Sequence, residues 1–216
     1  MEYLLNKISL PKKYHNFADR KTLFGIPNAM NVLSNIAILI PFFYLLKKKE
    51  NTNQENMLSE KNLLIIHILL LTIASIYYHY NPSDNTIFWD ILMIATLSII
   101  VLNIINNHEY GKLLYILSIL SVIYWKYSGD IKLYLIILIG VPIYFFLKYY
   151  KNKNDTIRKY LYFTIFFTIL YRIVELYDHQ IYKITGNIIS GHTLKHIFAG
   201  LSILYIVKLL EEDNKI

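Results

Sequence analysis

Long apolar segments separated by short polar ones are the feature that most limits the folds open to this chain. A helix needs about 20 mostly apolar residues to cross a bilayer, and its backbone hydrogen bonds must be satisfied within the helix. The sequence predicts seven such helices, over residues 28–46, 62–80, 87–105, 112–127, 131–149, 160–177 and 191–210. We therefore expect an all-α membrane protein in which residues 1–216 form a single domain, a seven-transmembrane helix bundle.

Composition and charge agree with a membrane location. Hydrophobic residues make up 55% of the 216 residues and charged residues only 17%, whereas a soluble domain has about a quarter of its residues charged. The formal net charge is +7, but the lysines cluster between the apolar segments, where they set topology and contact lipid head groups. We expect no nucleic-acid partner. The chain has no cysteine, so disulfides and thiolate metal ligands are excluded.

The order of the helices determines which polar residues share one face of the membrane. Seven spans place the termini on opposite sides, and the excess of lysine and arginine on the C-terminal side predicts a cytoplasmic C-terminus. His79 ends the second predicted span, Asp90 lies about one turn into the third, and His192 and His196 open the seventh. All four side chains are therefore expected at similar depth, near the face opposite the C-terminus.

The types of these residues favour a zinc site inside the bilayer. His192 and His196 are four residues apart, so they share a helix face and can offer two nitrogen atoms to one ion. With His79, three neutral imidazoles around Zn²⁺ leave a fourth position for a water molecule, whose pKa the metal lowers to about 7. Asp90 is suited to orient that water and transfer its proton. Ser75 lies four residues before His79 and is suited to donate a hydrogen bond to an oxyanion.

An alternative without a metal is open at this point. Histidine, serine and asparagine side chains also hydrogen-bond between neighbouring helices in membranes, and an H-x3-H pair by itself is a weak signal. The placement of all members on one side of the membrane strengthens the metal interpretation, because polar side chains at membrane depth are costly and need partners.

The same residues resemble a known family. Ser75-x3-His79, then Asp90 eleven residues after that histidine, then His192-x3-His196 in the last span, resembles the CREST superfamily of seven-helix membrane hydrolases, and within it the alkaline ceramidases. Further similarity to the ceramidase patterns and to the first-helix signature of the family lies in residues 75–82, 190–196 and 28–35.

The resemblance implies a function and a set of roles. Zinc would be held by His79, His192 and His196, with Asp90 and Ser75 completing a catalytic site. The implied reaction is hydrolysis of the amide bond of a ceramide-like membrane lipid to a sphingoid base and a fatty acid. The alternative within the superfamily is a receptor-like member, or a hydrolase of another lipid, with a structural zinc site. A haem protein is disfavoured, because axial ligands approach iron from opposite faces and an i, i+4 pair lies on one face.

The N-terminal segment departs from the family pattern. Eukaryotic alkaline ceramidases have an acidic calcium site there, but this chain offers Asp19, Asn28 and Asn31, with Asn28 where a glutamate would align. We therefore expect no calcium requirement. Asn28, Asn31 and Asn35 also form one polar stripe on the first predicted span, for which we favour packing against other helices over support of the zinc ligands.

Polar residues at the end of the sixth predicted span have two interpretations. Arg172 and Glu175 are three residues apart and can pair with each other. Alternatively, Glu175 or Asp178 accepts the second N–H of a ligand imidazole. We favour the ion pair. His67 lies in the middle of its span and is expected to be an interior histidine with a hydrogen-bond partner.

Overall fold

The computed structural model describes residues 6–49, 59–107 and 111–216, and the regular structure of these residues is helical, with one isolated antiparallel bridge between Leu23 and Ile26. The helices, in chain order, are η1 (Lys12–His15), α2 (Ala29–Ser34), η2 (Asn35–Leu39), α3 (Ile40–Lys49), α4 (Glu60–Tyr80), α5 (Asp84–Ile105), α6 (Gly111–Ser128), α7 (Lys132–Tyr149), α8 (Asp155–Leu176), α9 (Asp178–Ile184) and α10 (Gly191–Glu212). The labels η1 and η2 denote 3₁₀ helices.

Five of the described helices are long and apolar enough to cross a membrane: the continuous α2–η2–α3 helix (Ala29–Lys48), α4, α5, α7 and α10. A sixth is reached if α8 and α9, which are bent by 79° at their junction, count as one broken span. The predicted span at 112–127 corresponds to α6, which does not meet this criterion because lysines near both ends, with serine and tyrosine residues between them, lower its apolar content. The all-helical class is therefore confirmed for the described residues, whose five or six apolar helices are consistent with a multi-pass membrane protein, and the count of seven spans is not confirmed.

Side-chain caps explain where several helices begin. The hydroxyls of Ser59 and Ser83 accept a backbone N–H from the first turns of α4 and α5. The amide oxygen of Asn154 caps α8 in the same way, and the hydroxyl of Ser190 caps α10. The capping box at Ser83 starts α5 three residues before the predicted span. Asp90 is consequently the seventh residue of α5, nearly two turns from its start and not one turn as predicted.

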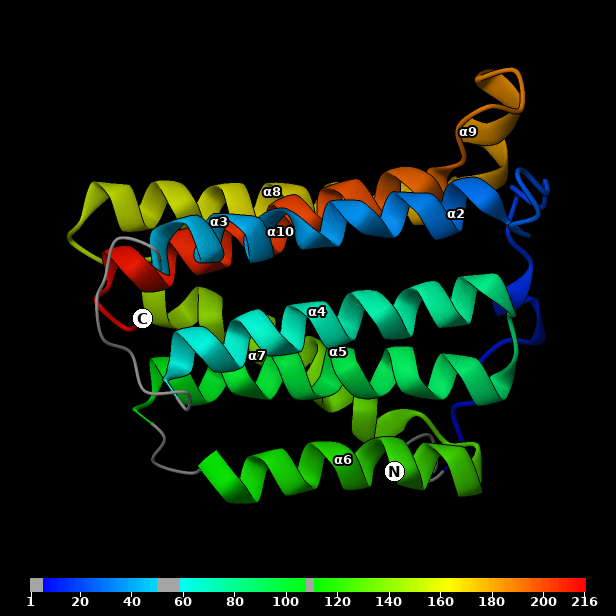
Figure 1. Cartoon of the computed structure of the whole chain (residues 1–216). Coiled ribbons are helices and arrows are strands. Elements are labelled where there is room, and N and C mark those ends of the chain that lie inside the picture. Colours follow the sequence, from blue (N-terminus) through cyan, green and yellow to red (C-terminus); the bar gives the residue numbers. More distant parts are fainter. Residues whose placement is uncertain (1–5, 50–58, 108–110) are drawn as a thin grey trace.

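The long helices run roughly parallel to one axis and pack side by side (Figure 1). α10 lies along α8 on one side and along α2, η2 and α3 on another, while α5 packs between α4, α6 and α7. A larger apolar core fills the end near the C-terminus, and a smaller core, which includes Phe17, Tyr78 and Trp125, lies toward the other end. His67 is buried and contacts the Thr96 hydroxyl at 2.7 Å, which confirms it as a partnered interior histidine.

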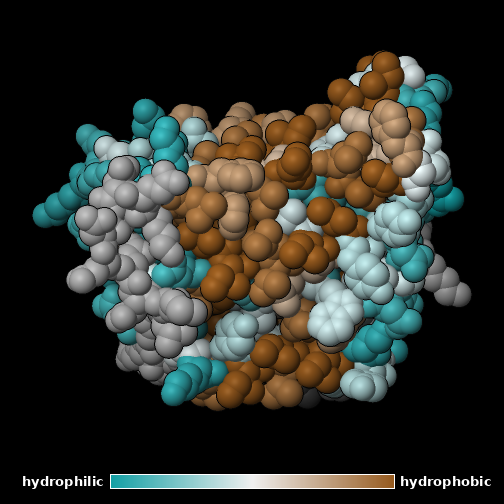
Figure 2. Space-filling view, in the orientation of Figure 1, coloured by the Kyte–Doolittle hydropathy of each residue, from teal (hydrophilic) through white to brown (hydrophobic). Residues whose placement is uncertain are grey.

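Hydrophobic side chains cover the middle of the molecule and hydrophilic ones gather at its two ends (Figure 2). This is the distribution expected when the bundle axis lies along the membrane normal, with the ends in the interfacial regions. The end that carries the start of α10 and the end of α4 therefore lies near one membrane surface.

The segment before α2 crosses this end of the bundle and is tied to several helices. Ile8 N–H donates to the Asp130 carboxylate at 3.2 Å, between α6 and α7. His15 Nδ1 contacts the Tyr78 hydroxyl of α4 at 3.0 Å, and Ala18 N–H donates to Asp178 at the start of α9, at 2.9 Å. The segment therefore covers the end of the bundle at which the candidate site lies.

Candidate metal centre

Three histidines from two distant parts of the sequence meet at this end of the bundle. His79 lies in the last turn of α4, and His192 and His196 lie in the first two turns of α10. Their side chains are buried, with relative exposures of 2%, 5% and 3%. His79 Nε2 is 3.4 Å from His192 Nε2 and 3.1 Å from His196 Nε2, and one ring nitrogen of each lies within 4.8 Å of the others. The convergence expected from the topology is confirmed.

The spacing of the nitrogen atoms fits a tetrahedral ion. Zn–N bonds of about 2.0–2.1 Å in tetrahedral geometry separate ligand nitrogens by about 3.3 Å, close to the two separations at His79 Nε2. Each ring nitrogen of a neutral imidazole carries either a proton or a lone pair, and a hydrogen bond joins one of each. Three ring nitrogens that face one another therefore cannot all be paired by hydrogen bonds among themselves. A cation uses all three lone pairs. These residues can therefore hold a metal ion, and three imidazoles leave one tetrahedral position for another ligand.

Ser34 sets the proton position on His196. The Ser34 hydroxyl donates to the Asn31 carbonyl at 3.1 Å and lies 2.7 Å from His196 Nδ1. The Asn31 carbonyl is also a hydrogen-bond partner of the His196 ring, and a carbonyl can only accept. The ring proton therefore belongs on the Nδ1 side, and the Nε2 lone pair of the neutral ring faces the other histidines. Metal-binding histidines characteristically have such a partner on the second nitrogen. His79 Nδ1, in contrast, is buried without a hydrogen-bond partner among the described residues.

Phe17 covers the site from the side of the N-terminal segment. Its ring centroid lies 4.9 Å from that of His79 and 4.6 Å from that of His192, and only 3% of the residue is exposed. An apolar ring in contact with two of the three histidines limits water access on that side and fixes the ring positions by packing.

The start of α10 is held close to α8 and α9. Asp178 accepts the His192 backbone N–H at 2.7 Å, and the Ser190 hydroxyl donates to the Asn31 side chain at 3.1 Å. A β-carbon on Gly191 would lie 2.0 Å from the Val174 carbonyl oxygen, so only glycine permits this approach. The first turn of α10, and with it His192, is thereby fixed against its neighbours.

The asparagine stripe mainly positions backbone, and its Asn31 carbonyl also accepts a hydrogen bond from the His196 ring. The Asn28 side chain donates to the His79 carbonyl at 2.9 Å, and Asn31 accepts from the Ser190 and Thr193 hydroxyls at 3.1 and 3.2 Å. The Asn35 side chain donates to the Asn31 carbonyl at 2.7 Å. The side-chain contacts agree with the packing interpretation, and the Asn31 carbonyl joins Ser34 as a partner of the His196 ring.

Asp19, the acidic residue of the same region, is occupied by protein donors. Its carboxylate accepts from Lys21 N–H, Met30 N–H and the Tyr182 hydroxyl at 3.1–3.2 Å. Among the residues that the structure describes, the three histidines are the only group with the spacing of a metal site. Independence from calcium stays a prediction.

Asp90 and Ser75 pair between the neighbouring helices α5 and α4, and Ser75 lies about one turn of α4 from His79. The Ser75 side chain is buried on α4 and hydrogen-bonds to the half-buried Asp90 carboxyl group on α5. Asp90 is not in the group of side chains whose ligand atoms lie within 4.8 Å of one another. The arrangement suits Asp90 to proton transfer, and its catalytic role and that of Ser75 stay predictions.

Charged side chains from α8 and α10 lie close to Asp90. Glu175 pairs with Arg172, at 2.9 Å, and with Lys195, which confirms the ion-pair interpretation for Glu175. Lys195 also interacts electrostatically with Asp90. Tyr14, in η1, interacts with the same charges. The Lys195 ammonium lowers the pKa of the Tyr14 phenol, whereas burial and the carboxylates of Glu175 and Asp90 raise it. The net effect is a raised pKa. Tyr14 is thus a neutral hydroxyl donor near the site.

The sequence did not predict the contributions of Ser34, Phe17, Tyr14 and Lys195. A usable signal existed for Lys195 alone, as a charged residue within an apolar helix directly before His196. No family model, no curated protein and no solved structure matches this chain, so the functional argument depends on the site and on the motifs.

Proposed function

We propose that this chain is a zinc-dependent intramembrane hydrolase that cleaves the amide bond of a ceramide-like lipid, with His79, His192 and His196 as the zinc ligands. The observation that carries the proposal is the convergence of three buried histidines, with His79 Nε2 at 3.4 and 3.1 Å from the Nε2 atoms of His192 and His196, separations that fit tetrahedral zinc. The similarity of the motifs to those of the alkaline ceramidases supports the choice of substrate. In this proposal α6 and the bent α8–α9 pair complete a bundle of seven spans.

The side chains around the histidines have complementary tasks. A bound Zn²⁺ supplies Lewis acidity and an activated water. Asp90 would serve as the proton acceptor and donor of the hydrolysis, taking a proton from the attacking water and returning one to the departing amide nitrogen. Ser75 holds the Asp90 carboxyl group and is a donor for the oxyanion. Ser34 keeps His196 in the ligand tautomer, and Phe17 excludes water.

The location of the site suits a lipid substrate. The three histidines lie at one end of the bundle, where hydrophobic surface gives way to hydrophilic surface. In this position a lipid keeps its acyl chains in the bilayer while its amide, just below the head group, reaches the histidines.

The test is hydrolysis by the purified full-length chain in lipid vesicles that contain ceramide and Zn²⁺, with the products measured by mass spectrometry. We expect free fatty acid and sphingoid base in equal amounts. Asp90→Ala should lower the rate by about 10²–10⁴-fold while zinc stays bound, and His79→Ala should lose both zinc and turnover. Asp155→Ala, an exposed carboxylate in the first turn of α8, is the matched control and should be unaffected.

Two results would contradict the proposal in different ways. Full turnover in folded His79→Ala would exclude the zinc mechanism. One bound zinc per chain without hydrolysis of any lipid amide or ester would favour the receptor-like alternative, in which the zinc is structural.

A further inference from the structure

The chain forms an elbow at the end of the bundle that carries the histidines. α8 ends at Leu176, and the seven-residue helix α9 starts at Asp178 and is bent from it by 79°. α9 therefore lies across the bundle axis and projects beyond the other helices (Figure 1). A helix perpendicular to spanning helices, at the depth where they end, lies parallel to the membrane surface. We call residues 176–189, together with the turn 23–26, the α9 elbow.

The α9 elbow exposes large apolar side chains. Phe24 is 97% exposed, Ile184 84%, Leu176 78% and Ile188 65%. Hydrophobic side chains cover the projecting corner of the molecule in Figure 2, although this end is otherwise hydrophilic. Scattered single apolar residues on a surface are ordinary, whereas a group of this kind indicates an interaction site.

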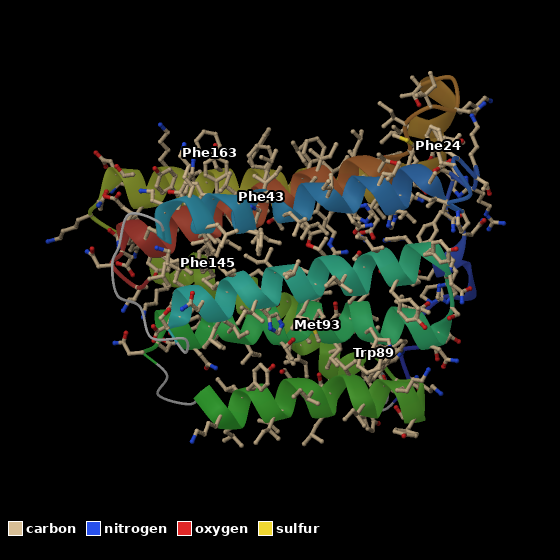
Figure 3. The ribbon with its side chains drawn as sticks, viewed as in Figure 1. Phe24, Phe43, Trp89, Met93, Phe145 and Phe163 are labelled. Atoms are coloured by element: carbon tan, nitrogen blue, oxygen red, sulfur yellow. The ribbon has the colours of Figure 1, made fainter. Side chains whose placement is uncertain are left out.

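The turn that carries Phe24 is a strained place for an aromatic residue. Leu23 and Ile26 exchange backbone hydrogen bonds of 3.1 and 2.9 Å around Phe24 and Gly25, whose φ angles are 53° and 76°. Two-residue turns with both φ angles positive favour Asn-Gly, and bulky residues rarely occupy this region. The Phe24 ring is almost wholly exposed, so contacts within the described chain do not offset the strain. A partner outside the chain would offset it. Phe24 is labelled near α9 in Figure 3.

The turn and the helix form one unit with a positive charge at its base. The Lys21 ammonium donates to the Asn187 carbonyl at 2.7 Å, and the Tyr182 hydroxyl donates to Asp19 at 3.2 Å. Lys21 and Lys183 are exposed cations beside the apolar residues. Apolar side chains bordered by lysine are typical of segments that lie in the boundary between lipid head groups and acyl chains.

We propose that the α9 elbow is a membrane anchor that inserts Phe24, Ile184 and Ile188 into the leaflet on the side of the histidines, with Lys21 and Lys183 at the lipid phosphates. The partner is the lipid surface. A second copy of the chain is the other candidate, and the location of the elbow at the end of a membrane span, with its two exposed lysines, favours lipid. This inference goes beyond the proposed hydrolase and holds with or without zinc.

The absence of cysteine makes a direct test possible, because single cysteines can be spin-labelled without removing others. Phe24→Cys, Ile184→Cys and Ile188→Cys are each labelled in the full chain and reconstituted into vesicles of phosphatidylcholine and phosphatidylglycerol. Collision with oxygen, which concentrates in lipid, is compared with collision with a water-soluble nickel chelate. The references are Ile136→Cys, an exposed position within α7, and Lys153→Cys, an exposed position in the α7–α8 loop.

We expect the oxygen-to-nickel ratio at the three elbow positions to be severalfold above that of Lys153→Cys and close to that of Ile136→Cys. Ratios equal to that of Lys153→Cys would overturn the proposal, since the elbow would then lie in water. Labels shielded from both reagents, with spin–spin broadening between copies, would also overturn it and identify a second chain as the partner. If Phe24→Cys disturbed the turn, the ratios at Ile184→Cys and Ile188→Cys would still report where the elbow lies.

Discussion

Ser34 and Phe17 show what sequence analysis of the site could and could not provide. The three histidines were predictable because the i, i+4 spacing puts His192 and His196 on one helix face and the alternation of helix direction brings His79 to the same end of the bundle. Ser34 and His196 are separated by 162 residues, and no local pattern links a serine on the first span to one ring nitrogen on the last. Phe17 lies in a segment without a regular period, so its position against His79 and His192 became visible only in three dimensions.

At the residue scale, Ser34→Ala should weaken zinc binding by about 10–100-fold, because the 2.7 Å contact that helps to orient the His196 ring is lost. Competition with a chromophoric chelator measures the affinity. Ser98→Ala removes a hydroxyl of α5 that donates to the Ile94 carbonyl of its own helix and serves as the control. An affinity for zinc unchanged by Ser34→Ala would show that this contact does not support the ligand.

At the scale of elements, the helices were predictable and their junctions were not. Apolar length located each long helix to within a few residues, although polar starts such as Asp84 and Asp155 were missed because caps, and not hydrophobicity, set them. The 3₁₀ segment η2 and the helix α9 gave no signal. α9 is too short for an apolar period, and η2 lies where α10 approaches closely.

Gly200 tests the packing of α10 against η2. A β-carbon there would lie 2.1 Å from the Ala37 carbonyl oxygen, whereas a β-carbon on Gly140 of α7 would meet nothing within 4 Å. Gly200→Ala should therefore destabilise the fold by about 1–3 kcal/mol through overpacking. Gly140→Ala should be neutral or stabilise by up to about 1 kcal/mol, since alanine favours helix. Thermal unfolding in detergent distinguishes the two, and equal midpoints would contradict the close approach.

At the scale of the whole molecule, the arrangement of the helix ends was predictable from the order of the helices alone. The ends of α4 and α8 and the starts of α5 and α10 lie at the end of the bundle away from the C-terminus (Figure 1). The number of spans was less certain from hydropathy, because α6 and α8 combine apolar stretches with charged residues, and five helices, or six with the bent pair, meet the apolar criterion.

The orientation of the bundle is a separate prediction. The excess of lysine and arginine near the C-terminal end predicts that this end faces the cytoplasm and that the histidines lie near the opposite face. A fluorescent protein fused after Ile216 should fold and fluoresce, while alkaline phosphatase at the same position should be inactive. The reverse pattern would show that the site faces the cytoplasm.

The metal content of the purified chain tests the central claim most directly. Elemental analysis of the full-length protein, prepared without chelators, should find about one zinc per chain, and X-ray absorption should show three nitrogen ligands at about 2.0–2.1 Å. Alanine at His79, His192 and His196 together should remove the metal, whereas alanine at His67, a buried histidine away from the group, should not. A wild-type protein without a bound divalent metal, or one whose zinc survives loss of the three histidines, would contradict the account.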